Sequence, residues 1–273
     1  MGDETAQNVS TDDALFAACR SGNLAQVDEL VNSGHDVNQK ALVDGSTPLH
    51  AAVLSGSTAV VARLVERGAD PTIPNKNGTS PIVLAVQGGD VEVARTLVNH
   101  LNAAKLNEVR NTAGHTLLYM AAHKNDSQMA RMLLEADVQP AVPAAESGNT
   151  PLHVAAFRGN ADVCKLLLLF DAPVNVESSN GFTPLHVAAA AGAGAVVRLL
   201  LQNGADASVR SRSGLLPADC TSDQALAASM RESISHVVDV KGTVSAPVFG
   251  AADRHLSLVG HLPAPRTVNA RKM

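Results

Sequence analysis

The sequence predicts an all-α solenoid of stacked helix–turn–helix units joined by β-hairpin or finger loops. Two observations carry this prediction. First, the phrase Thr47-Pro48-Leu49-His50 returns unchanged at 150–153 and 183–186, with worn copies at 80–83 and 116–119. Second, a glycine lies two residues before each copy, and these glycines and a last one at Gly214 are spaced by 33, 36, 34, 33 and 33 residues. A unit of this length cannot cover its own apolar face, so its neighbours must stack against it.

The first two predicted units span 12–41 and 42–75. The first is expected to be an N-terminal capping unit. In the second, Thr47 suits the N-cap, where its hydroxyl accepts a hydrogen bond from an otherwise unpaired backbone N–H. Pro48 suits the first helical position, because an N–H there would be unpaired in any case. Val60, Val61, Leu64 and Val65 then give the second helix its apolar stripe.

The same layout predicts units at 76–111, 112–145, 146–178 and 179–211, followed by a partial closing unit at 212–240. Small alanines within the first helices allow neighbouring units to approach closely. The flanking segments, 1–11 and 241–273, lack this periodicity and are predicted to be disordered. The second of them is basic, with five Lys and Arg against Asp253.

The third and fourth units depart from the pattern. Val83 and Tyr119 stand where the phrase has His, and three extra residues separate the third glycine from the fourth. One interpretation is tolerated decay in interior repeats, which both neighbours support, and we favour it. The other is a local bend or a softer seam near 99–112.

Taken together, the registered copies resemble the ankyrin-repeat family over residues 12–220. The resemblance implies that a protein partner meets the fingertips and the exposed ends of the first helices, which line a concave face. We carry this over by register to the second unit, where Val43, Asp44, Ser46 and Leu54 hold such positions, and to the fourth, fifth and sixth units. The candidate partner-binding residues there, with Phe170 added from the end of a second helix, are His115, His123, Lys124, Glu146, Phe157, Arg158, Phe170 and Phe182.

Three of these candidates are aromatic in a chain that has only five Phe. Phe157 and Phe182 fall in slots that normally face solvent, and Arg158 is adjacent. Aromatic side chains and Arg are the usual anchors of interfaces. The alternative is that the rings point inward and fill gaps between repeats; we favour the interface.

His50, His153 and His186 occupy equivalent positions, one in each of three units. We therefore expect each to form hydrogen bonds within its own finger and not to form a metal or acid–base set. No metal site, cofactor or catalytic constellation is predicted. In the tail, Arg254-His255-Leu256-Ser257 resembles a site for basophilic kinases, which makes Ser257 a candidate for phosphorylation.

Composition narrows the class of partner. The net charge is −5, and because the basic tail contributes +4, residues 1–240 carry −9, which argues against a nucleic-acid platform. The chain has no apolar run of the roughly 18 residues that a membrane span needs, and its acidic start lacks the regions of a signal peptide. Three separated Cys suit a reducing compartment, so we expect the protein in the cytoplasm, with the nucleus left open. We also expect a monomer.

The function expected from the resemblance is a non-catalytic interaction module, an adaptor or scaffold for protein partners. The alternative is a regulatory or assembly subunit of an enzyme complex, of which a gankyrin-like proteasome chaperone is one example in architecture. An enzyme is not expected, because the repeats take up nearly all of the ordered length.

Overall fold

The computed structural model describes residues 11–241, and side chains within 14–234. The predictions of disorder at both ends lie outside these residues except at Thr11 and Lys241, which are the outermost residues of helices, and the prediction of phosphorylation at Ser257 lies outside them entirely. Within 11–241 the chain is helical, with no β-strand. The helices are α1 (Thr11–Arg20), α2 (Leu24–Asn32), α3 (Pro48–Ser55), α4 (Thr58–Glu66), α5 (Pro81–Gly88), α6 (Val91–Val98), α7 (Ala103–Glu108), α8 (Leu117–Lys124), α9 (Ser127–Glu135), α10 (Pro151–Arg158), α11 (Ala161–Leu169), α12 (Pro184–Ala190), α13 (Gly194–Gln202), the 3-10 helix η1 (Pro217–Cys220) and α14 (Gln224–Lys241).

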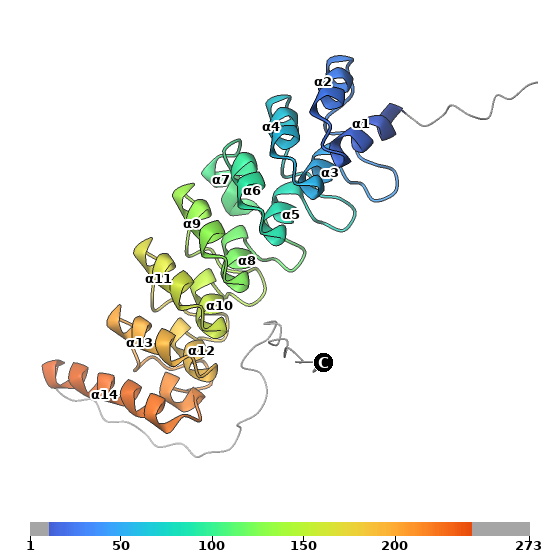
Figure 1. Cartoon of the computed structure of the whole chain (residues 1–273). Helices are drawn as coiled ribbons and strands as arrows, with labels where there is room; N and C mark the ends of the chain where they lie inside the picture. The colour runs from blue at the N-terminus through green and yellow to red at the C-terminus, as the bar shows by residue number, and fades with distance from the viewer. Residues whose placement is uncertain (1–10, 242–273) are drawn as a thin grey trace, which may run out of the picture.

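The helices form two layers of an elongated, curved array, which confirms the predicted solenoid (Figure 1). One layer holds the first helix of each unit, from α1 to α12, and the other holds the second helices, from α2 to α13. Finger loops project from the first-helix side (Figure 1). The expected β-hairpins reduce to turns there: the pairing found within 11–241 is an isolated antiparallel bridge between Arg110 and Thr116.

The core runs as one continuous stripe between the layers. Leu49, Leu152 and Leu185, the leucines of the intact phrases, are fully buried. So are the alanines three residues after them, and these small side chains let adjacent first helices approach closely. At the C-terminal end, Met230 of α14 is fully buried and closes the stripe.

The three extra residues of the third unit form structure. Residues 103–108 make the short helix α7, begun by Asn102, whose side chain accepts a hydrogen bond from the Lys105 N–H. Leu106 anchors this helix in the core at 1% exposure. The insertion therefore adds a short helix to the third unit and packs against the core through Leu106.

Three second helices, α6, α9 and α11, end without the glycine that follows α2, α4 and α13, and in two of them an Asp takes its backbone conformation. Asp137 and Asp171 follow α9 and α11 with φ of 60°. This is the left-handed region, which Asp tolerates better than most residues. Asp at these two positions therefore preserves the backbone conformation that glycine has in the other units.

Candidate functional site on the finger and first-helix face

The Thr-His pair of each intact phrase fixes the finger that precedes its helix. In the second unit the Thr47 N–H donates to His50 Nδ1 at 2.9 Å, and the Thr47 hydroxyl lies 2.9 Å from the same nitrogen. Since Nδ1 accepts, the hydrogen of the neutral imidazole is on Nε2. His153 and His186 make the same contacts with Thr150 and Thr183.

Each of these imidazoles also reaches the next unit, which corrects the expectation of purely local bonds. His50 Nε2 lies 2.9 Å from the Thr79 carbonyl oxygen. His153 Nε2 lies 2.8 Å from that of Phe182, and His186 Nε2 lies 3.0 Å from that of Leu215. Burial lowers the pKa of all three, that of His153 to about 4, so they remain neutral donors.

The structure also corrects the expectation about Phe182. Its side chain is buried, at 6% exposure, and does not face solvent. Its carbonyl accepts the His153 bond, and its ring packs edge-on against His186 with centroids 5.4 Å apart. Phe182 is therefore part of the junction between two units.

The three aromatic candidates do not form a cluster. Phe157 is half-buried near the end of α10, whereas Phe170 caps the end of α11. Because α10 and α11 run antiparallel, Phe170 lies near the start of α10, about 9 Å from Phe157 along the helix axis. Phe182 lies at that starting end too, through its bond to His153.

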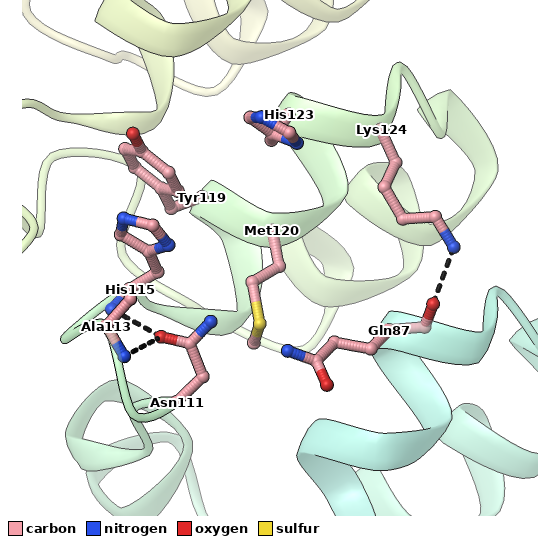
Figure 2. A pocket seen from close by; sticks show the side chains of 8 residues that line it. All are labelled: Gln87, Asn111, Ala113, His115, Tyr119, Met120, His123 and Lys124. Carbon is pink, nitrogen blue, oxygen red and sulfur yellow. Dashed lines mark hydrogen bonds between the residues drawn. The ribbon is translucent and has the colours of Figure 1, made fainter. Parts of the chain in front are cut away.

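The candidates of the fourth unit do come together, beside a cleft of about 300 Å³ between α5 and α8. Figure 2 shows Met120 at its centre, between Gln87 of α5 and the rings of His115 and Tyr119. The residues lining the cleft are Gln87, Asn111, Ala113, His115, Tyr119, Met120, His123 and Lys124.

Tyr119 holds the position that His takes in intact phrases, and its side chain is buried at 1% exposure. Its ring stacks on that of His115, with centroids 4.2 Å apart and planes 18° from parallel (Figure 2). Because no His side chain bonds to the Thr116 hydroxyl, that hydroxyl accepts the Tyr119 N–H at 3.0 Å, as an ordinary N-cap. Asn111 Oδ1 accepts the N–H groups of Ala113 and His115, which fixes the finger.

The cationic side of the cleft lies at the end of α8. Lys124 Nζ donates to the Gln87 carbonyl at 2.6 Å and spans the cleft (Figure 2). Arg158 of α10 donates to His123 Nε2 at 3.1 Å. Burial, and then the positive charge of Arg158, lowers the pKa of His123.

A second hollow, also about 300 Å³, adjoins the first on the other side of His115 and is lined by Glu146 of the next finger. Burial lowers the pKa of His115, and the charge of Glu146 opposes that shift. Sequence reasoning missed the roles of Gln87, Asn111, Tyr119 and Met120. Tyr119 was detectable, because it stands in the His position with His115 four residues before it.

Within 11–241, no group of three or more His, Cys, Asp or Glu is arranged to hold a metal ion. Burial also raises the pKa of Cys19 and Cys164 to about 12, so these thiols stay protonated. No helix in the same residues is both long and apolar enough to cross a membrane.

Comparison with known proteins gives a consistent family. A family model described as ankyrin repeats (3 copies) matches residues 2–75, 63–144 and 141–211. Among solved structures, the ankyrin repeat domain of Bcl-3, a member of the IkappaB protein family, superposes with a TM-score of 0.74 at 29% identity. That superposition covers 80% of this chain and 97% of the Bcl-3 domain.

Two curated relatives are larger proteins. The human transient receptor potential cation channel subfamily A member 1 is 34% identical over 126 residues, which is 46% of this chain and 11% of the channel. The chicken nuclear factor NF-kappa-B p105 subunit is 30% identical over 150 residues, which is 55% of this chain and 14% of the subunit. The chain thus spans a small part of each.

Proposed function

The chain belongs to the ankyrin-repeat family, whose repeats are in general protein–protein interaction modules, and on that premise we propose a non-catalytic adaptor that binds a protein partner on its finger and first-helix face. One observation carries the choice of face. The last turns of successive first helices present a row of equivalent side chains that the array leaves at least partly open. The row consists of Leu54, Gln87, His123, Phe157 and Ala190.

The side chains of the row change along the array from apolar to aromatic and cationic. At its N-terminal end Leu54 is 72% exposed, a large apolar side chain in water. Over the fourth and fifth units it becomes imidazole and aromatic, with Arg158 and Lys124 beside it. Aromatic and Arg side chains at the centre of a surface with apolar contacts around them are typical of protein interfaces.

Two exposed leucines give a matched test. Leu54 lies on α3 in the proposed face, and Leu169 lies on α11 in the second-helix layer, and each is 72% exposed. We expect Leu54→Asp to lose a captured protein partner that Leu169→Asp retains. Affinity capture with quantitative mass spectrometry measures this, with circular dichroism showing that both variants fold. Equal retention by both would remove the proposal for this face.

The similarity to Bcl-3 favours a second candidate, a regulatory or assembly subunit of a larger complex. The match covers nearly the whole Bcl-3 domain, so an array of this size exists within the IkappaB protein family. A gankyrin-like assembly chaperone belongs to the same functional class. Native mass spectrometry separates the candidates. A regulatory subunit is detected in one stoichiometric complex, whereas an adaptor is detected with several partners or as a 28.1 kDa monomer.

A further inference from the structure

The end of α8 and the end of α10 form a positively charged corner of the proposed binding face, which we call the α8–α10 corner. It consists of Tyr119, Met120, His123, Lys124 and Arg158. The two full positive charges, on Lys124 and Arg158, reach neutral acceptors: the Gln87 carbonyl and the His123 imidazole. Among the described residues, the ion pairs lie elsewhere, between Arg63 and Asp28 or Glu66 and between Arg231 and Asp219.

Two carboxylates lie near the corner. Asp126 accepts the Met129 N–H through Oδ1 as the N-cap of α9, and its Oδ2 lies beside Gly89, as Lys124 Nζ does. Glu146 acts on His115, on the finger side of the cleft. The charge of Arg158 acts at this corner: burial and then this charge lower the pKa of His123, and the same charge opposes the rise to about 12 that burial gives the pKa of Tyr119.

The surroundings add an apolar floor. Met120 lies at the centre of the cleft, with Lys124 on one side and the buried Tyr119 ring on the other (Figure 2). A volume of about 300 Å³ is enough for one or two side chains of an extended segment. The overall charge of −5 does not oppose an anion here, because salt screens charges beyond about 8 Å and the corner contacts its ligand directly.

We propose that the α8–α10 corner binds an Asp or Glu side chain of an extended acidic segment in the protein partner, whose neighbouring apolar side chain lies over Met120 and Tyr119. The Arg158 guanidinium and the Lys124 ammonium donate to the carboxylate, and His123 donates as a second, weaker partner. Arg is suited to this role because its planar fork matches two carboxylate oxygens. The inference rests on the proposed function, because it assumes that this face binds a protein.

The test is a selection of random 12-residue peptides on the full chain, repeated on two double variants. Lys124→Ala/Arg158→Ala removes the two corner charges. Arg131→Ala/Lys165→Ala is the matched control, because it removes two exposed cations from α9 and α11 in the same repeats. We expect peptides rich in Asp and Glu that bind the parent and the control alike and bind the corner variant about tenfold more weakly.

Resynthesised peptides identify the anion. Replacing the selected Glu by Gln should weaken binding about tenfold, as expected when a charge-assisted bond is lost. A peptide that binds only after Glu is replaced by phosphoserine would overturn the carboxylate assignment. Circular dichroism and thermal melting accompany each variant. If the double variant melts early, Lys124→Glu at an exposed side chain gives the same comparison.

The other outcomes separate this inference from the proposed function. Peptides that lack acidic residues yet lose binding with Leu54→Asp would overturn the acidic-segment assignment and leave the binding face standing. Acidic peptides unaffected by the corner variant would do the same. Peptides indifferent both to Leu54→Asp and to the corner variant would overturn the two proposals together.

Discussion

The junction between the fifth and sixth repeats and the junction between the third and fourth differ in how they are held. In the first, His153 reaches the Phe182 carbonyl at 2.8 Å, and the Ser179 N–H donates to the Ser147 carbonyl at 3.0 Å. In the second, Val83 replaces the His, and no finger-to-finger backbone bond is found among the described residues. That junction is crossed by hydrogen bonds from Lys124 to Gln87 and from the Gln139 N–H to Asn107.

The difference separates two uses of one repeat. At the first junction the slot before the helix holds Phe182, whose side chain is buried. At the second junction the equivalent side chain, His115, is only half-buried beside a cleft. The junction that lacks the His bridge is thus the one that carries the polar and aromatic side chains that we assign to binding. We expect stability to be concentrated at the first junction and recognition at the second.

The largest expected effect comes from His153→Ala, which removes the bridge of the tight junction. The fully buried side chain leaves a cavity, and the Phe182 carbonyl and Thr150 N–H lose their partner. We expect the free energy of unfolding to fall by about 3 kcal/mol, measured by urea titration. His100→Ala, at an exposed position after α6, is the control and should cost under about 0.5 kcal/mol. Equal costs would mean that the bridge does not hold the junction.

The comparison also shows what the sequence could predict. Helices and repeat units follow from signals within one unit, such as Thr47-Pro48 at a helix start and the apolar stripe after it, and the solenoid prediction is confirmed. The burial of Phe182 was not predicted, because the register places its slot toward solvent, and the bond from His153, which lies 29 residues earlier, is not a signal within the sixth unit. Helix α7 had a readable signal, Asn102 as an N-cap before good helix formers, but the period of about 33 residues leaves no place for it.

The candidate site was predictable by register and not by residue type. Equivalent positions in successive units identified His115, His123, Lys124 and Arg158, and the structure brings them together around α8. The scarcity of Phe suggested a cluster of Phe157 and Phe170, but α10 and α11 run antiparallel and place these two rings at opposite ends of α10. Register is set by the repeat itself, whereas clustering of aromatic rings depends on helix direction and burial.

A second effect, on pH dependence, should be nearly as large. The pKa of His153 is about 4 in the folded protein because burial disfavours the charged form, against 6.5 when exposed. The unfolded chain therefore binds the proton first, and stability present above pH 6.5 is lost as the pH falls toward 4. From pH 7.5 to pH 5 we expect a loss of about 2 kcal/mol from this residue. Burial also lowers the pKa values of His50 and His186, which adds to the loss.

Urea titrations at several pH values check this expectation. In the His153→Ala variant the loss between pH 7.5 and pH 5 should shrink by about the same 2 kcal/mol. An unchanged pH slope in that variant would show that other groups govern the acid limb.

A matched pair of glycines compares the two junctions directly. Gly78 and Gly148 have φ of 72° and 66°, and a Cβ on either would meet an atom of the next finger at 2.7 Å. For Gly78 that atom is the Thr112 side-chain methyl, which can move. For Gly148 it is the Ser179 backbone nitrogen, which is held in a hydrogen bond, and the Ser179 Oγ is closer still at 2.6 Å. We expect Gly78→Ala to cost about 1 kcal/mol and Gly148→Ala about 2 kcal/mol, from denaturation curves. Equal costs would mean that the two fingers are equally free to shift.

The smallest expected effect needs no substitution and concerns local opening. The Ser179 N–H is bonded to the preceding finger, and so is the Arg212 N–H one unit later, at 3.0 Å. At the equivalent position of the fourth unit, the Thr112 N–H has no such bond within the described part of the chain. Amide exchange should therefore be about tenfold faster at Thr112 than at Ser179, because exchange there requires no separation of fingers. Equal protection would show that the third and fourth repeats are held as firmly as the fifth and sixth. A partner would then bind the cleft as a rigid, preformed surface.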